Sequence, residues 1–233
     1  MTKVAKIELE GQTHEFPIIE GSEGEKAIDI SKLRGTTGHI TLDNGFANTG
    51  SCRSAITFLN GEQGILRYRG YPIEQLSERS RFMEVSYLLG YGELPNTIQL
   101  KNYERKVANL ATLPHGICKM LDHFPKNAHP MDVIRTCVSL MALEDKDTKD
   151  NSPKANMRKA LKIFSQTPTA VAAYFRARKG KKVISPDKKL SFSENFFKMM
   201  FGKVPDKEIV RAFDISLILY AEHSFNVSTF TAR

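Results

Sequence analysis

The spacing of apolar residues changes once along this 233-residue chain, and that change limits the folds open to it. Up to about residue 60, short stretches alternate apolar and polar side chains, the period of a strand with one buried face. From about Tyr71 onward, apolar residues recur every three or four positions, as on an amphipathic helix. The sequence therefore predicts a mainly α fold, with a small β-rich segment over residues 1–60 and a helical part over residues 61–233.

The β-rich segment contains one clear hairpin. Apolar and polar residues alternate over residues 5–9 and 16–18, on either side of the turn sequence Glu10-Gly11-Gln12. Two further brief strands are expected: residues 40–42 and residues 55–59.

Capping residues mark the expected helices. Ser80 is a candidate N-cap for a helix that Gly90 or Gly92 would end, Asn96 or Thr97 opens the next, and Pro130 suits a first turn. Cys137 lies on an apolar stripe and is expected in the core. Pro168 interrupts a long helical pattern, so a helix there is expected to kink or break.

Composition indicates an intracellular protein. The chain is 41% hydrophobic and 26% charged, and no stretch approaches the roughly 18 apolar residues of a membrane span. The first residues contain both acid and base rather than the apolar core of a signal peptide. The three cysteines are widely spaced and form no CxxC pair, so neither disulfides nor structural zinc are expected. We therefore predict a cytoplasmic protein without a membrane partner.

The net charge of +8 raises the alternative of a helical module that binds nucleic acid. The basic residues gather between Arg176 and Lys189, where Gly180 and Pro186 also lie. No aromatic residues interleave with these charges, as a surface for single strands would require. A solvated connector between two helices is the favoured interpretation, and no nucleic-acid partner is expected.

The last residues, Ala221–Arg233, join a helical pattern to a polar cluster. The final helix is expected to be central, and to carry His223 on the buried stripe that includes Tyr220. A histidine there is more often a hydrogen-bonded core residue than a ligand contact. Its neighbours Asn226 and Ser228 favour the other interpretation, a helix end that opens on a pocket for a small polar ligand.

Three other histidines lie close together in the sequence, but a metal site is not expected. His115, His123 and His129 are eight and six residues apart, which places them on no common helical face. No pair of carboxylates completes a ligand set.

Several segments resemble the N-terminal part of the longer bacterial citrate synthases, in the family's order. The most specific is residues 64–76, which read GILRYRGYPIEQL. The others are residues 43–58, 129–131, 167–169, 195–201 and 217–233. The resemblance covers essentially the whole chain.

The resemblance implies a mostly α, dimer-forming or higher homo-oligomeric protein with a large and a small domain. The reaction it implies condenses acetyl-CoA with oxaloacetate and water to give citrate and CoA, the entry step of the tricarboxylic acid cycle. This is an acyltransferase reaction that needs no metal or redox cofactor, since acetyl-CoA is a substrate. The closely related 2-methylcitrate synthase, which uses propionyl-CoA, is the alternative.

By their place in the family motif, three residues are implied to bind substrate. His223 corresponds to a histidine that hydrogen-bonds oxaloacetate, and Asn226 and Ser228 match positions lining the same pocket. The base aspartate, two catalytic histidines and the arginines that clamp carboxylates would all follow Arg233. The resemblance therefore implies an incomplete large domain that ends before the small domain, contains no catalytic residue and is inactive alone.

Overall fold

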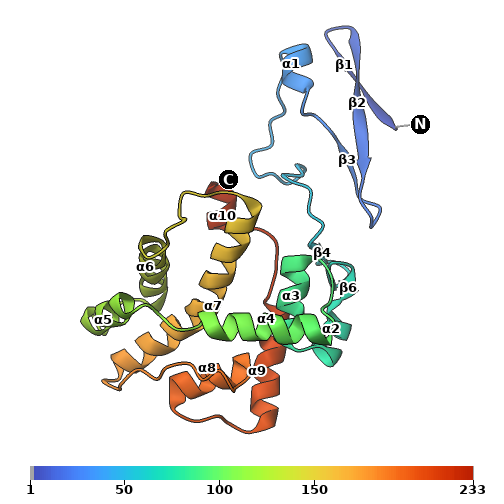
Figure 1. Cartoon of the computed structure of the whole chain (residues 1–233). Helices are drawn as coiled ribbons and strands as arrows, with labels where there is room; N and C mark the ends of the chain where they lie inside the picture. The colour runs from blue at the N-terminus through green and yellow to red at the C-terminus, as the bar shows by residue number, and fades with distance from the viewer. Residues whose placement is uncertain (1–2, 233) are drawn as a thin grey trace. The chain divides into compact units, whose positions relative to one another are not determined.

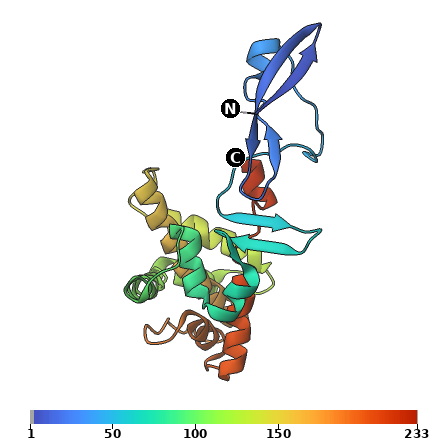
Figure 2. The same ribbon diagram turned by 90° about the vertical axis from the view of Figure 1, so that its right-hand side faces the viewer.

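The computed structural model describes residues 3–232, and the chain divides into two units, Met1–Ser54 and Ala55–Arg233. The first is a small β structure with one short helix, and the second carries the other helices (Figures 1 and 2). The predicted fold class, mainly α with a small N-terminal β-rich segment, is confirmed.

The first unit is built around the predicted hairpin. Strand β2 (Gln12–Glu20) lies between β1 (Val4–Leu9) and β3 (Lys26–Ile28) in an antiparallel sheet. Glu10 and Gly11 have φ angles of 52° and 77°, as a tight turn that follows the strand twist requires at both central positions. The hairpin prediction is confirmed.

The strand predicted at residues 40–42 is wrong. This segment is irregular, and the side chains of Ile40 and Leu42 are 72% and 86% exposed. Alternation makes a strand only where a partner strand and a buried face are available. Strand β3 and the short helix α1 (Leu33–Thr37) were not predicted.

The second unit begins with a small antiparallel sheet. Strand β5 (Ile65–Tyr68) pairs with β4 (Thr57–Asn60) on one side and with the short β6 (Tyr71–Pro72) on the other. The strand predicted at residues 55–59 is confirmed. Thr57 and Tyr68 are directly opposite each other in this register.

Helices make up the rest of the second unit (Figure 1). They are α2 (Ile73–Arg79), α3 (Phe82–Tyr91), α4 (Thr97–Leu110), α5 (His115–His123), α6 (Pro130–Leu143), α7 (Pro153–Arg178), α8 (Phe192–Phe201), α9 (Lys207–Leu219) and α10 (Val227–Ala232). No helix within residues 3–232 has the length and apolar character needed to cross a membrane.

Most of the predicted caps are confirmed. The Asn96 side chain accepts hydrogen bonds from the N–H groups of Ile98 and Gln99 at the start of α4. Pro130 is the first residue of α6. Gly92 ends α3 with a φ of 93°, but that helix begins after Arg81 rather than Ser80.

Helix α7 contacts α4, α5, α6 and α8, so it is the centre of the helical packing. Of the predicted kink or break at Pro168, the break does not occur: α7 is 26 residues long and contains Pro168. Pro168 has no N–H to donate within the helix. The hydroxyl of Thr167 donates a hydrogen bond to the carbonyl of Ile163 nearby.

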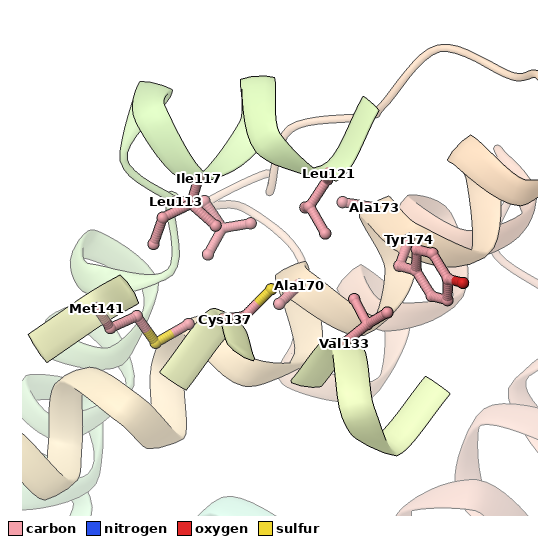
Figure 3. Packing of buried hydrophobic residues seen from close by; sticks show 9 residues of the cluster. All are labelled: Leu113, Ile117, Leu121, Val133, Cys137, Met141, Ala170, Ala173 and Tyr174. Carbon is pink, nitrogen blue, oxygen red and sulfur yellow. The ribbon is translucent and has the colours of Figure 1, made fainter. Parts of the chain in front are cut away.

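The core of the second unit includes a cluster between α5, α6 and α7. Figure 3 shows Cys137 of α6 pointing toward Ala170 of α7, with Leu121 of α5 nearby. Cys137 is fully buried, which confirms the prediction for it. A second cluster surrounds Tyr68, whose ring packs with residues of α2, α3 and α9.

Candidate functional site

The predicted polar cluster lies on a loop between α9 and α10. Helix α9 ends at Leu219, and Tyr220 closes it through its N–H, which lies 3.1 Å from the carbonyl of Ser216. His223 follows in irregular backbone and is exposed. The prediction that His223 continues the buried stripe of a central helix is therefore wrong. Of the residues of α9, Ile218 is the buried one.

The hydroxyl of Tyr68 contacts the main chain just where the helix ends. Its oxygen lies 2.9 Å from the carbonyl oxygen of Glu222 and 3.3 Å from that of Leu219. It also lies 3.3 Å from the N–H of Glu222. These contacts satisfy main-chain groups that a continued helix would pair internally. Burial raises the pKa of the Tyr68 phenol above its ordinary value.

The Glu222 side chain fixes the loop from a second direction. Its carboxylate accepts hydrogen bonds from the hydroxyl of Thr57 and, at 2.7 Å, from the N–H of Ser224. Ser224 has a φ of 72°, a left-handed conformation that non-glycine residues seldom adopt. The residues on both sides of His223 are thus tied down, while its imidazole faces solvent.

Asn226 and Ser228 lie just beyond, at the start of α10. The side-chain oxygen of Asn226 accepts a 2.7 Å hydrogen bond from the N–H of Thr229 and so caps this helix. Ser228 is in the first turn, and both residues are exposed. Within residues 3–232, no hydrogen bond joins the side chains of His223, Asn226 and Ser228 to one another. The three residues therefore lie on one short segment, but their side chains do not hold one another in place.

Sequence reasoning missed Tyr68 and Thr57 as partners of this loop. They lie more than 150 residues before Glu222, so no local spacing connects them. A fully buried tyrosine generally needs a hydrogen-bond partner for its hydroxyl, and this was the one available signal.

Two cavities of the second unit bear on the choice of site. One, of about 220 Å³, is lined by aromatic side chains of α3, α4 and α7 and reaches Ala221, two residues before His223. The other, of about 440 Å³, is bordered by four basic residues, Arg81, Arg105, Lys188 and Lys189, but by no residue of the loop. Of these two cavities, the first lies next to the loop that carries His223.

Part of the basic segment Arg176–Lys189 stabilises its own surroundings. Arg176 donates to the carbonyl of Met200, and Arg178 donates to that of Lys126. The Lys179 ammonium lies 4.3 Å from the centre of the Phe175 ring. These contacts fit the interpretation of the segment as a connector between helices.

Two of the three clustered histidines, His129 and His123, have local roles. The ring nitrogen Nδ1 of His129 accepts from the N–H of Met131 and caps α6, and Nδ1 of His123 lies 2.8 Å from the carbonyl of Lys119. Across the described residues, His, Cys, Asp and Glu side chains form no group of three that could hold a metal ion.

Comparison with known proteins identifies the family. The family model for the citrate synthase C-terminal domain matches residues 45–233. Citrate synthase 1 of Mycobacterium tuberculosis is 38% identical over 235 residues, which cover 98% of this chain and 54% of the relative.

Solved structures agree with this match. Citrate synthase from Thermotoga maritima has a TM-score of 0.72 at 37% identity, over 82% of this chain and 50% of that one. Citrate synthase from Pyrobaculum aerophilum has a TM-score of 0.75 at 30% identity, and the match covers 92% of this chain and 52% of that one. The chain spans about half the length of the curated relatives it matches. The resemblance found in the sequence is confirmed: the chain belongs to the citrate synthase family.

Proposed function

We propose that this chain forms part of a citrate synthase, which condenses acetyl-CoA with oxaloacetate and water to give citrate and CoA, and that His223 binds the oxaloacetate. Family membership supports the reaction. The observation that carries the role of His223 is its placement, because an exposed imidazole lies between Glu222 and Ser224, which are both held by hydrogen bonds.

The chemistry of the loop suits this substrate. Oxaloacetate presents two carboxylates and a ketone, which accept hydrogen bonds, so its site must supply donors. The ring N–H of His223, the side-chain N–H₂ of Asn226 and the hydroxyl of Ser228 are such donors. Asn226 uses its oxygen to cap α10, which leaves the N–H₂ group as the part that a ligand would meet. The net charge of +8 also favours the approach of a dianion.

The proposed catalytic groups lie elsewhere in the protein. The reaction needs a base to remove a proton from the acetyl methyl group and donors to stabilise the enol oxygen. The loop supplies binding groups, and the chain spans only about half the length of its curated relatives. We therefore infer that the 233-residue chain alone makes no citrate. The reaction would use no cofactor beyond its substrates.

We extend the proposal to assembly and location. Apolar side chains of the loop and α10 are exposed, among them Val227 at 82% and Phe230 at 40%, and such surface favours burial against another part of a homodimer or higher homo-oligomer. The three cysteines, all among the described residues, are free thiols. Free thiols agree with the reducing cytoplasm.

The test measures citrate and free CoA with two proteins, the 233-residue chain and the longest product of its reading frame. The proposal predicts both products from the longest protein and neither from the 233-residue chain alone. No citrate from the longest protein would contradict the activity. Citrate from the 233-residue chain would contradict the inference that the catalytic groups lie elsewhere. Replacing acetyl-CoA by propionyl-CoA in the same assay tests 2-methylcitrate synthase.

A further inference from the structure

The two side chains that hold the loop come from one cross-strand pair. Thr57 of β4 and Tyr68 of β5 are directly opposite in the antiparallel register, so their side chains lie on the same face of the sheet. Both hydroxyls reach Glu222, which follows 154 residues after Tyr68. Thr57 binds the carboxylate of Glu222, and Tyr68 binds its main chain.

We propose that Tyr68 and Thr57 are positioning residues that set the orientation of His223 toward oxaloacetate. This inference rests on the proposed function, because it assumes that His223 is the ligand. Neither residue is expected to touch the substrate. Their effect passes through Glu222, the residue directly before His223.

The contacts leave the His223 backbone little freedom. Tyr68 holds the main chain where α9 ends, at the carbonyls of Leu219 and Glu222. The Glu222 carboxylate reaches past His223 to the N–H of Ser224. The imidazole therefore keeps mainly the freedom of its own side-chain torsions, and a group held in this way binds with less loss of entropy.

The hydroxyls are separable from the packing of the same side chains. The Tyr68 ring packs with Leu76, Leu88 and Ile218, and a phenylalanine would keep those contacts. Thr57 is on a strand. Valine has nearly the same shape as threonine, and it is a residue that strands favour. Tyr68→Phe and Thr57→Val thus remove the contacts to Glu222 with little other change.

A second buried tyrosine provides a matched control. The hydroxyl of Tyr174 lies 2.9 Å from the carbonyl of Pro125 and 3.0 Å from that of Ala128. Tyr174 is 4% exposed, so Tyr174→Phe also removes a buried hydroxyl that bonds a loop, but not the loop of His223.

The experiment makes the three variants in the longest product of the reading frame and records two quantities. Hydrogen–deuterium exchange of peptides covering residues 219–226 is measured without substrate. The KM for oxaloacetate, the KM for acetyl-CoA and kcat are then measured at steady state. We expect Tyr68→Phe and Thr57→Val to speed exchange in residues 219–226 and to raise the KM for oxaloacetate about three- to tenfold, the order of magnitude that the loss of one hydrogen bond implies. Tyr174→Phe should change neither.

A loss of folded protein alone would lower kcat and leave both KM values unchanged, so the KM for oxaloacetate distinguishes positioning from a structural effect. The proposal is overturned if exchange in residues 219–226 or the KM for oxaloacetate matches the Tyr174→Phe control in both variants. Failure of the proposed function looks different, because the unmodified protein would then make no citrate. The exchange data would still show whether the two hydroxyls hold the loop.

Discussion

The backbone N–H of Phe82 donates a 2.8 Å hydrogen bond to the carboxylate of Asp214, which ties the start of α3 to α9. The same carboxylate accepts a 2.7 Å hydrogen bond from the hydroxyl of Ser193 in α8. Three helices of the second unit therefore meet at one acidic side chain that is only 14% exposed.

Replacing this carboxylate should destabilise the second unit. Asp214→Ala leaves the N–H of Phe82 and the buried hydroxyl of Ser193 without their acceptor. Because hydrogen bonds to a charged group are stronger than neutral ones, we expect a loss of about 3 kcal/mol in the free energy of unfolding, measured in urea. Ser193→Ala removes one of the two contacts and should lower the free energy of unfolding by about 1.5 kcal/mol. Equal losses in the two variants would contradict this account of Asp214.

Two glycines near the end of α3 should respond to alanine in opposite directions. Gly92 has a φ of 93° and Gly90 does not have a positive φ, while an added Cβ would meet no atom within 4 Å at either position. Gly92→Ala should lower the free energy of unfolding by about 1 kcal/mol, because alanine is strained in the left-handed region. Gly90→Ala should raise the free energy of unfolding by as much as about 1 kcal/mol, because alanine favours the helix. Thermal unfolding of both variants checks this, and shifts of the same sign would show that the helix does not end at Gly92.

Asp145 should make stability depend on acid pH. Two hydrogen bonds from Arg158, of 3.0 and 2.9 Å, lower the pKa of this carboxyl well below its usual value. A carboxyl with a lowered folded pKa stabilises the protein above the unfolded pKa of about 4, and this contribution is lost as pH falls through the folded pKa. Asp145→Asn should therefore be less stable at pH 7, with the difference shrinking in acid.

The measurement is urea unfolding between pH 7 and pH 2. The unmodified protein should take up about one more proton on unfolding in acid than Asp145→Asn does. Identical slopes of stability against pH for the two proteins would contradict the role given to Asp145.

The elements that were predicted correctly are those determined by residues close together in the sequence. The hairpin at residues 4–20 has alternating side chains and a turn with Gly11, and α4 has Asn96 as its cap. The strand expected at residues 40–42 failed because alternation does not supply a partner strand. Helix α7 runs through Pro168 because packing from four other helices outweighs the hydrogen bond lost at the proline.

The candidate site was predictable only in part. The residues His223, Asn226 and Ser228 follow from the sequence, and from the family resemblance in particular. Their setting does not, because the main chain at the end of α9 contacts the hydroxyl of Tyr68, which lies far away in the sequence. Apolar periodicity extended the helix to His223, since a pattern of side chains does not reveal a distant main-chain contact.

The role of His223 is tested most directly by the steady-state kinetics of His223→Gln in the longest product of the reading frame. The exposed His123 of α5 gives the control variant His123→Gln. We predict that His223→Gln raises the KM for oxaloacetate about tenfold or more, the effect of losing a hydrogen bond to a charged ligand. The KM for acetyl-CoA should stay unchanged, and His123→Gln should alter neither value. An unchanged KM for oxaloacetate in His223→Gln would contradict the assignment of His223 as the oxaloacetate ligand.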